Sequence, residues 1–149
     1  MCIRDRLFGV SPDGNIENNY KKVFADVKKW CSSNLYIDFI MPQVYYGFFN
    51  ETKPFKEVID EWESIITDEN VKFYVALAFY KVGEVDNYAK SGKEEWINNS
   101  DIIMREIITS RNLNKYQGFS LFRYDYIFNE AMYNEVTVME IENMKKVLN

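Results

Sequence analysis

The feature that most constrains the fold is the segment from Tyr36 to Phe48, which reads Y-I-D-F-I-M-P-Q-V-Y-Y-G-F. It opens as a nearly unbroken apolar run and closes on Pro42, Gln43, Tyr45 and Tyr46. A run that is apolar on both faces predicts a central strand of a parallel sheet, covered by helices on both sides. Because ligands bind at the carboxyl ends of such strands, the same segment predicts where a site lies.

The rest of the chain repeats this alternation of an apolar strand and an amphipathic helix. The order βα-βα-βα-βα predicts an α/β fold, because right-handed crossovers lay successive strands parallel. A closed eight-fold barrel needs ~200 residues or more, and four units are half of one. The predicted strands are Leu7–Val10, Tyr36–Val44, Val71–Phe79 and Tyr116–Phe122, and the predicted helices span Tyr20–Cys31, Pro54–Ile66, Ser100–Ile108 and Thr137–Leu148.

Local signals refine these helices. Trp30 and Trp62 occupy equivalent places on the first two helices, and both are predicted to lie in the core. Thr137 and Glu140 form a T-x-x-E pattern, which predicts a capping box at the start of the closing helix. A polar loop from Tyr80 to about Asn99 far exceeds the ~2–6 residues that are usual for such connections.

Composition excludes several classes of function. The net charge of −5 provides no basic footprint, so we expect no nucleic-acid partner. No apolar run approaches the ~20 residues that span a bilayer. There is no histidine, and the two cysteines, Cys2 and Cys31, lack metal-ligand spacing, so we expect neither a metal nor a cofactor. Acid–base chemistry would have to use Asp, Glu, Tyr or Lys.

Polar and aromatic residues follow each predicted strand, and parallel strands bring these positions to one rim. Amides, hydroxyls, charges and aromatic rings together suit a carbohydrate ligand. Alternatively, the rings only plug the mouth of a barrel, Arg123 pairs with Asp125 or Asp13, Gln43 bonds a neighbouring loop, and Lys81 is solvated. The predicted substrate-binding residues are Ser11, Asn15, Gln43, Tyr45, Tyr46, Tyr80, Lys81, Arg123 and Tyr124, with Asp13 and Asp125 beside them.

Hydrolysis of a glycosidic bond generally needs two carboxylates about 5–9.5 Å apart. On the predicted rim, Asp13, Glu17 and Asp125 are the plausible carboxylates, with Asp13 and Asp125 retained as catalytic candidates. None of them stands in a strong motif, so the sequence identifies no catalytic pair.

Five motifs occur in order along the chain. Together they resemble the second half of glycosyl-hydrolase-like family ten, the bacterial family-10-like glycosylhydrolases. The motifs are F-G-V-S-P-D-G-N-I-E-N-N-Y (Phe8–Tyr20), A-D-V-K-K-W (Ala25–Trp30), I-D-F-I-M-P-Q-V-Y-Y (Ile37–Tyr46), V-A-L-A-F-Y-K-V-G (Val75–Gly83) and Q-G-F-S-L-F (Gln117–Phe122).

The resemblance implies a partial (β/α)₈ barrel over residues 7–149, an open half-barrel made of strands five to eight. It implies a bacterial glycoside hydrolase acting on a polysaccharide, with peptidoglycan glycan strands as a substrate class. An acidic F-D-D-Y-type motif at the end of the fourth strand would precede Phe8. The resemblance therefore places the main acid in a missing N-terminal half, the partner of this fragment, which would be inactive alone.

The resemblance also implies an extracytoplasmic or cell-surface location for the parent protein. By residue-by-residue match, two positions depart from the family pattern, namely Asp13, where many members carry an aromatic residue, and Arg123, where a small or hydroxyl residue is common. The positions that match family residues at the rim are Ser11, Pro12, Gly14, Gln43, Tyr45, Tyr80 and Lys81.

The first six residues, M-C-I-R-D-R, resemble translated sequencing-adaptor DNA at the head of metagenomic reading frames, and we expect them to be non-native. A genuine short tail is the alternative. Two further alternatives concern function. The chain could belong to a non-catalytic carbohydrate-binding barrel, or it could be a complete small α/β domain with an unrelated metabolic role.

Overall fold

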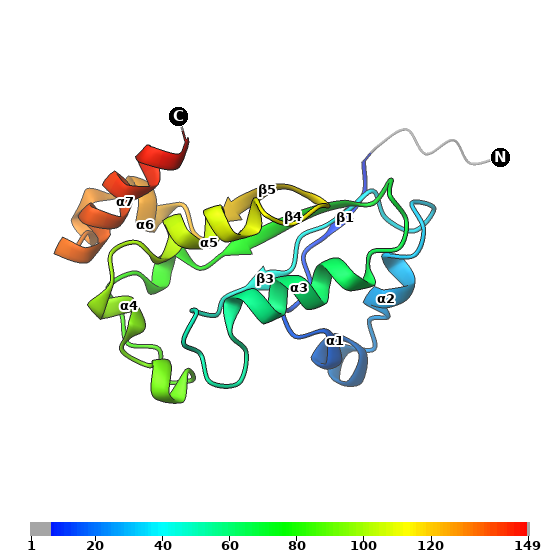
Figure 1. Ribbon diagram of the computed structural model, residues 1–149, viewed down its shortest axis with the longest axis horizontal. Helices are drawn as coiled ribbons and strands as arrows, with labels where there is room; N and C mark the ends of the chain where they lie inside the picture. The colour runs from blue at the N-terminus through cyan, green and yellow to red at the C-terminus, as the bar shows by residue number, and fades with distance from the viewer. Residues whose placement is uncertain (1–6, 149) are drawn as a thin grey trace.

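The computed structural model describes residues 7–148, so the prediction for the six-residue head lies outside the described part. Its strands form one parallel sheet (Figure 1), and each strand lies within a range that the sequence predicts. β2 and β3 both pair with β4, and β5 pairs along β4 on its other side. The strands are β1 (Gly9–Val10), β2 (Phe39–Ile40), β3 (Gln43–Val44), β4 (Lys72–Leu77) and β5 (Tyr116–Leu121).

The predicted strand Tyr36–Val44 is present in two pieces, β2 and β3, and it starts later than predicted. The break falls at Met41 and Pro42, because proline has no N–H group to donate to a ladder. Hydrogen bonds continue across the break, since the N–H of Ala76 donates to the Pro42 carbonyl at 3.0 Å and that of Met41 to Val10 at 2.9 Å. β2 and β3 are therefore one strand of the sheet in structural terms.

Helices connect and follow the strands, and short 3₁₀ turns lie at Phe79–Lys81, Lys90–Gly92 and Glu130–Met132. The loop predicted between Tyr80 and Asn99 is partly helical, because α4 forms within it. The α-helices are α1 (Ile16–Val23), α2 (Val27–Trp30), α3 (Phe55–Ile65), α4 (Glu95–Asn98), α5 (Ile102–Ser110), α6 (Asp125–Phe128) and α7 (Glu135–Leu148).

The single helix predicted over Tyr20–Cys31 is wrong, because the chain breaks it into α1 and α2. Phe24 adopts a left-handed conformation with φ of 56°, and its N–H donates to the Asn19 carbonyl. This left-handed residue ends α1 in the manner of a helix C-cap. Tyr20 and Phe24, which the pattern places on a buried face, are exposed as a result.

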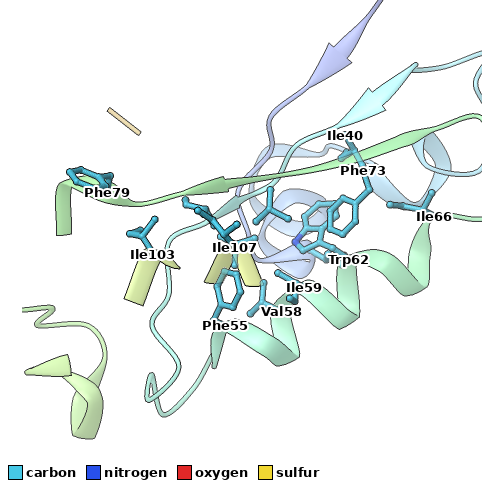
Figure 2. Packing of buried hydrophobic residues seen from close by; sticks show 14 of the residues in the cluster. Ile40, Phe55, Val58, Ile59, Trp62, Ile66, Phe73, Phe79, Ile103 and Ile107 are labelled. Atoms are coloured by element: carbon cyan, nitrogen blue, oxygen red, sulfur yellow. The ribbon is translucent and has the colours of Figure 1, made fainter. Parts of the chain in front are cut away.

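The core lies between the sheet and one helical layer (Figure 2). Phe73 and Ile40 of the sheet point toward Trp62 and Ile66 at one end of this layer. Trp62 is fully buried, as predicted, whereas Trp30 is only partly buried. Burial of side chains of this size contributes about 1.5–3 kcal/mol each, so this layer dominates the stability of the domain.

The prediction that helices cover both sides of the sheet is wrong, because the opposite face stays partly exposed. Phe39 and Tyr74 pack edge to face there, with ring centroids 5.7 Å apart, and both remain partly exposed. A Cβ on Gly9 would lie 2.0 Å from the Phe39 ring, so a larger residue at that position would displace the ring. Neither ring belongs to the buried core cluster, which shows that the helices pack on the other face.

The closing helix starts earlier than predicted and has a different cap. Asn134 Oδ1 accepts hydrogen bonds from the Thr137 N–H at 2.8 Å and from its hydroxyl at 3.1 Å. Glu140, predicted to complete a capping box in its own helix, instead accepts from the Met104 N–H in the first turn of α5 at 3.0 Å. The predicted box is therefore wrong, and Glu140 joins α7 to α5.

The fold is α/β with a parallel sheet, as predicted. Within residues 7–148, no helix is both long enough and apolar enough to cross a membrane.

Candidate functional site

The loop after β1 is held in one conformation by its own amides. Asp13 Oδ1 accepts from the Asn15 N–H at 2.7 Å, and Asn15 caps α1 by accepting from the Asn18 N–H. The buried Asn19 amide donates to the carbonyls of Asp13 and Asn15 at 2.6 and 2.9 Å. These bonds fix the backbone of residues that the sequence predicts to contact ligand.

The tip of β3 packs directly against this loop. The Gln43 amide donates to the Ser11 carbonyl at 3.1 Å, so Gln43 bonds the neighbouring loop, one of the two roles open from sequence. A Cβ on Gly14 would lie 2.4 Å from the Gln43 carbonyl oxygen and 3.0 Å from the Tyr46 ring. Glycine at this position lets the two strand ends approach, and the fully buried Trp62 indole donates to its carbonyl at 2.7 Å.

The loop after β4 supplies a buried ion pair. Lys81 Nζ donates to Asp86 Oδ2 and to the Tyr45 carbonyl, each at 2.7 Å. Only 17% of the Lys81 side chain and 2% of the Asp86 side chain are exposed. Asp86 also accepts from the Tyr88 N–H at 3.1 Å. Lys81 is thus not a solvated lysine but the link between the tips of β3 and β4.

A second carboxylate of the same loop organises the chain after β3. Glu95 accepts from the N–H groups of Phe48 and Phe49 at 3.0 and 2.9 Å, one with each oxygen. Arg105 lies 3.7 Å away, and a Cβ on Gly47 would lie 2.1 Å from a Glu95 oxygen. Burial raises the pKa of Glu95, while the two backbone N–H donors oppose the shift.

These contacts shape a depression of about 350 Å³ at the carboxyl ends of the strands, which we call the rim depression. It brings together six predicted residues, the substrate-binding candidates Asn15, Gln43, Tyr45, Tyr46 and Lys81 and the catalytic candidate Asp13. Its size lies within the range of small-ligand sites. Its remaining lining residues are Asn50, Thr52, Lys53, Asp86 and Tyr88.

A neighbouring depression of about 460 Å³ shares Lys81, Asp86 and Tyr88 with the rim depression. Tyr80, a predicted binding residue, lines it together with Tyr126.

Tyr80 packs edge to face on Tyr45 and on Phe122, with ring centroids 5.8 Å away in each case. Tyr45 stacks on Phe122 at 5.7 Å. Both roles considered from sequence, plugging the sheet end and facing a depression, therefore apply to these rings.

Four predicted residues, Ser11, Arg123, Tyr124 and Asp125, line neither depression. Ser11 contributes only its carbonyl to Gln43. Arg123 pairs with Asp125 at 3.5 Å, as one alternative from the sequence anticipated, and both side chains are about half exposed. Tyr124 is 71% exposed and packs on Phe128.

Sequence reasoning missed Asp86 and Tyr88, which both lie in the long loop after β4. The unusual length of that loop was the available signal, because long loops in compact domains are often functional. It also missed Asn50, which lies in the turn between β3 and α3 and lines the rim depression. Asn50 is buried and its Oδ1 accepts from the N–H groups of Thr52 and Lys53, so its side chain builds the turn.

The rim depression offers acids, cations and phenols to a polar ligand. Burial, followed by the charges of Asp13 and Asp86, raises the pKa of Tyr46 to about 12. Burial and the neighbouring Tyr80 raise the pKa of Tyr45 to about 12 as well. Both phenols therefore stay protonated at neutral pH and can donate hydrogen bonds. Among residues 7–148, no group of three or more His, Cys, Asp or Glu side chains is placed to hold a metal ion.

Comparison with known proteins gives relatives of one kind. The chain is 26% identical over 136 residues to glycosyl hydrolase DigH of Escherichia coli K12, a match that covers 80% of this chain and 30% of that protein. It is 25% identical over 126 residues to glycosyl hydrolase YngK of Bacillus subtilis strain 168, covering 74% of this chain and 23% of that protein. The chain thus spans about 30% of the length of the Escherichia coli relative.

The model of one protein family, glycosyl hydrolase-like 10, matches residues 5–97. This range is more than half of the chain, and it includes the loop after β1, the tip of β3 and the loop after β4 up to Ile97. The three segments that build the rim depression are therefore the segments that the family shares, and the chain belongs to the glycosyl hydrolase-like 10 family.

Proposed function

We propose that this chain is the part of a glycoside hydrolase that binds a polysaccharide across the carboxyl ends of its parallel strands. The observation that carries the proposal is the rim depression, where Gln43, Tyr46, Asn15 and Lys81 converge from three separate loops. Amides, protonated phenols and a cation supply donors for sugar hydroxyls, and aromatic rings offer apolar faces. Peptidoglycan glycan strands are the substrate class we favour, with an extracytoplasmic location for the parent protein.

We further propose that additional βα units complete a (β/α)₈ barrel around this sheet, to which this chain contributes strands five to eight. Support comes from β1 and β5, which have an unpaired edge within residues 7–148, and from the Phe39–Tyr74 face, which helices leave partly exposed. Unpaired edges are normally covered or closed. The short span of the match to the Escherichia coli relative agrees with this proposal.

Hydrolysis would use one carboxylate as acid and another as base or nucleophile. Asp13 and Asp86 line the rim depression, and both already bond protein groups. Asp125, the other candidate, pairs with Arg123 outside it. We therefore propose that the main acid comes from the added units. Because no carboxylate among the described residues of the rim depression is free of protein partners, a second candidate function is a carbohydrate-binding barrel without hydrolysis.

Isothermal titration with soluble glycan strands released from peptidoglycan tests the binding proposal. Tyr88 is 89% exposed and lines the rim depression, so Tyr88→Ala should weaken binding about tenfold without changing the fold. Tyr124→Ala is the matched control, because Tyr124 is also exposed but lies outside the depression. Equal binding by Tyr88→Ala and the unmodified chain would exclude the rim depression as the binding site.

Release of reducing ends from the same strands tests the position of the acid. We expect none from this chain alone. Cleavage that disappears in Asp13→Asn or Asp86→Asn would show that the acid lies within the chain and would refute the assignment to added units.

A further inference from the structure

A depression outside the rim is lined by residues of α1, α2 and α3, together with Lys53. Figure 1 shows these three helices near one another. Its volume is about 460 Å³, equal to that of the larger depression at the strand ends. Tyr20 lines it and is 62% exposed, so its ring is available to a ligand. Lys21 and Lys28 line it as well. Its mixture of an aromatic ring, cations and carboxylates has the same chemical character as the rim depression.

Lys53 lines both this depression and the rim depression, so the two adjoin at this residue. Glu61 of α3 lies 3.7 Å from Lys53 Nζ and is itself part of the outer lining. Asn50 Oδ1 accepts from the Lys53 N–H at 2.9 Å, which holds the backbone at this crossing point. Lys53 therefore connects the lining of the rim depression to the lining that contains Tyr20.

The cations of the outer depression differ in their engagement. Lys21 forms an ion pair with Glu17, with Nζ 2.5 Å from Oε1. Lys28, in contrast, forms no ion pair within the described part of the chain and is left as a free donor beside Tyr20. Asp26 at the start of α2 accepts from the Lys29 N–H with Oδ1. An aromatic platform beside a free ammonium group suits a sugar unit, whose hydroxyls accept hydrogen bonds and whose ring face is apolar.

We infer that the depression lined by Tyr20, Lys28 and Lys53 is a distal subsite for a glycan chain that is bound at the rim depression. This inference rests on the proposed function and deepens it. It assigns the protein to long glycan strands rather than disaccharides, because a ligand that occupies both depressions must be longer than one that fills the rim depression alone.

Titration with glycan strands from peptidoglycan, separated by length, tests the inference on the full chain. The unmodified protein should bind long strands more tightly than the disaccharide unit. Tyr20→Ala should weaken binding of the long strands about tenfold and leave the disaccharide unchanged. Phe24→Ala is the matched control, since Phe24 is 88% exposed near α1 but does not line the depression.

The outcomes separate the two proposals. If Tyr88→Ala weakens all strands but neither Tyr20→Ala nor Lys28→Ala affects any length, the rim site stands and the distal subsite is wrong. If Phe24→Ala reduces binding as much as Tyr20→Ala, the effect is not specific to the depression, and the inference is again wrong. If no strand of any length binds, both the proposed function and the subsite fail.

Discussion

Two regions of this protein contain buried carboxylates, and the regions differ in how many hydrogen bonds these carboxylates accept. In the loop after β4, both oxygens of Glu95 accept hydrogen bonds from backbone N–H groups, and Asp86 is paired with Lys81. At the interface of α5 and α7, Glu106 is fully buried, and neither of its oxygens accepts a hydrogen bond from any described group. Glu140 beside it bonds the Met104 N–H with one oxygen and leaves the other without a partner.

The comparison distinguishes two kinds of buried carboxylate. Glu95 and Asp86 hold the loops around the site in place, whereas Glu106 and Glu140 lower the stability of the fold when they are charged. A buried carboxylate with partners fixes the groups around it, because removal of one partner leaves the other unsatisfied. A buried carboxylate without partners is held more easily in its neutral form. Accordingly, burial and the neighbouring Glu140 raise the pKa of Glu106 well above its ordinary range. Burial raises the pKa of Glu140 to about 7.

The largest expected effect is at Glu95. Glu95→Ala leaves two backbone N–H groups unsatisfied next to Arg105, and should lower the free energy of unfolding by about 3–5 kcal/mol. Urea denaturation followed by circular dichroism measures the loss. Glu95→Gln retains one acceptor and serves as the control, with a smaller loss expected. A loss below about 1 kcal/mol for the alanine variant would contradict the view that this carboxylate organises the loop.

The next effect is at the buried ion pair. Lys81→Met removes the cation from Asp86 and the donor from the Tyr45 carbonyl, and should cost about 3 kcal/mol by the same denaturation measurement. The double variant Lys81→Met, Asp86→Asn should recover part of this loss, because it no longer leaves an unpaired buried charge. If the double variant is less stable than the single one, the pair is not the source of the loss.

Glu140 at the α5–α7 interface should make the free energy of unfolding fall as pH rises. A carboxylate in a salt bridge has the opposite effect. The folded state holds a proton on Glu140 up to a pKa of about 7, whereas its ordinary value is 4.5. The folded state therefore binds more protons than the unfolded state, and its stabilisation is complete below the unfolded value and is lost as pH rises. Between pH 5 and pH 7 this single group should cost about 2 kcal/mol of unfolding free energy.

Glu140→Gln is the variant that isolates the effect of this group, because the neighbouring carboxylates, Glu106 in α5 and Asp101 just before it, remain in place. Denaturation curves from pH 5 to pH 8 should be flatter for the variant than for the unmodified chain. Parallel curves would show that Glu140 titrates at the same pH in both states. The comparison between the two regions would then lose its basis.

The smallest effect is expected at the start of α7, where Asn134 lies against Gly83 of the loop after β4. Asn134→Ala removes the acceptor for the Thr137 N–H and should cost about 1 kcal/mol. Asn129→Ala is matched to it, since Asn129 accepts from the Ala131 N–H in an exposed short turn and should cost less. Equal losses in thermal denaturation would mean that the position of Asn134 between the two regions has no energetic weight.

The fold was more predictable than the site, for physical reasons that particular residues illustrate. Apolar periodicity located every strand and the core helix that contains Trp62, because burial of large side chains follows a local pattern. It failed at Phe24, where a left-handed residue splits a helix without a glycine to signal the break. At the rim, strand ends located Gln43, Tyr45, Tyr46 and Lys81. They could not locate Asp86, because it follows no strand directly and only the folded path of the long loop brings it back to Lys81.

The sequence by itself determined the α/β class, the parallel strands and the family, since each depends on short motifs and on local hydrophobic patterning. The segment Tyr36–Phe48 contained both a strand and the residues of its tip. Only the tertiary structure decided that one face of that strand stays partly exposed, that Gln43 bonds the loop before α1, and that Lys53 lies between two depressions. These features depend on contacts between segments distant along the chain, which no local pattern encodes.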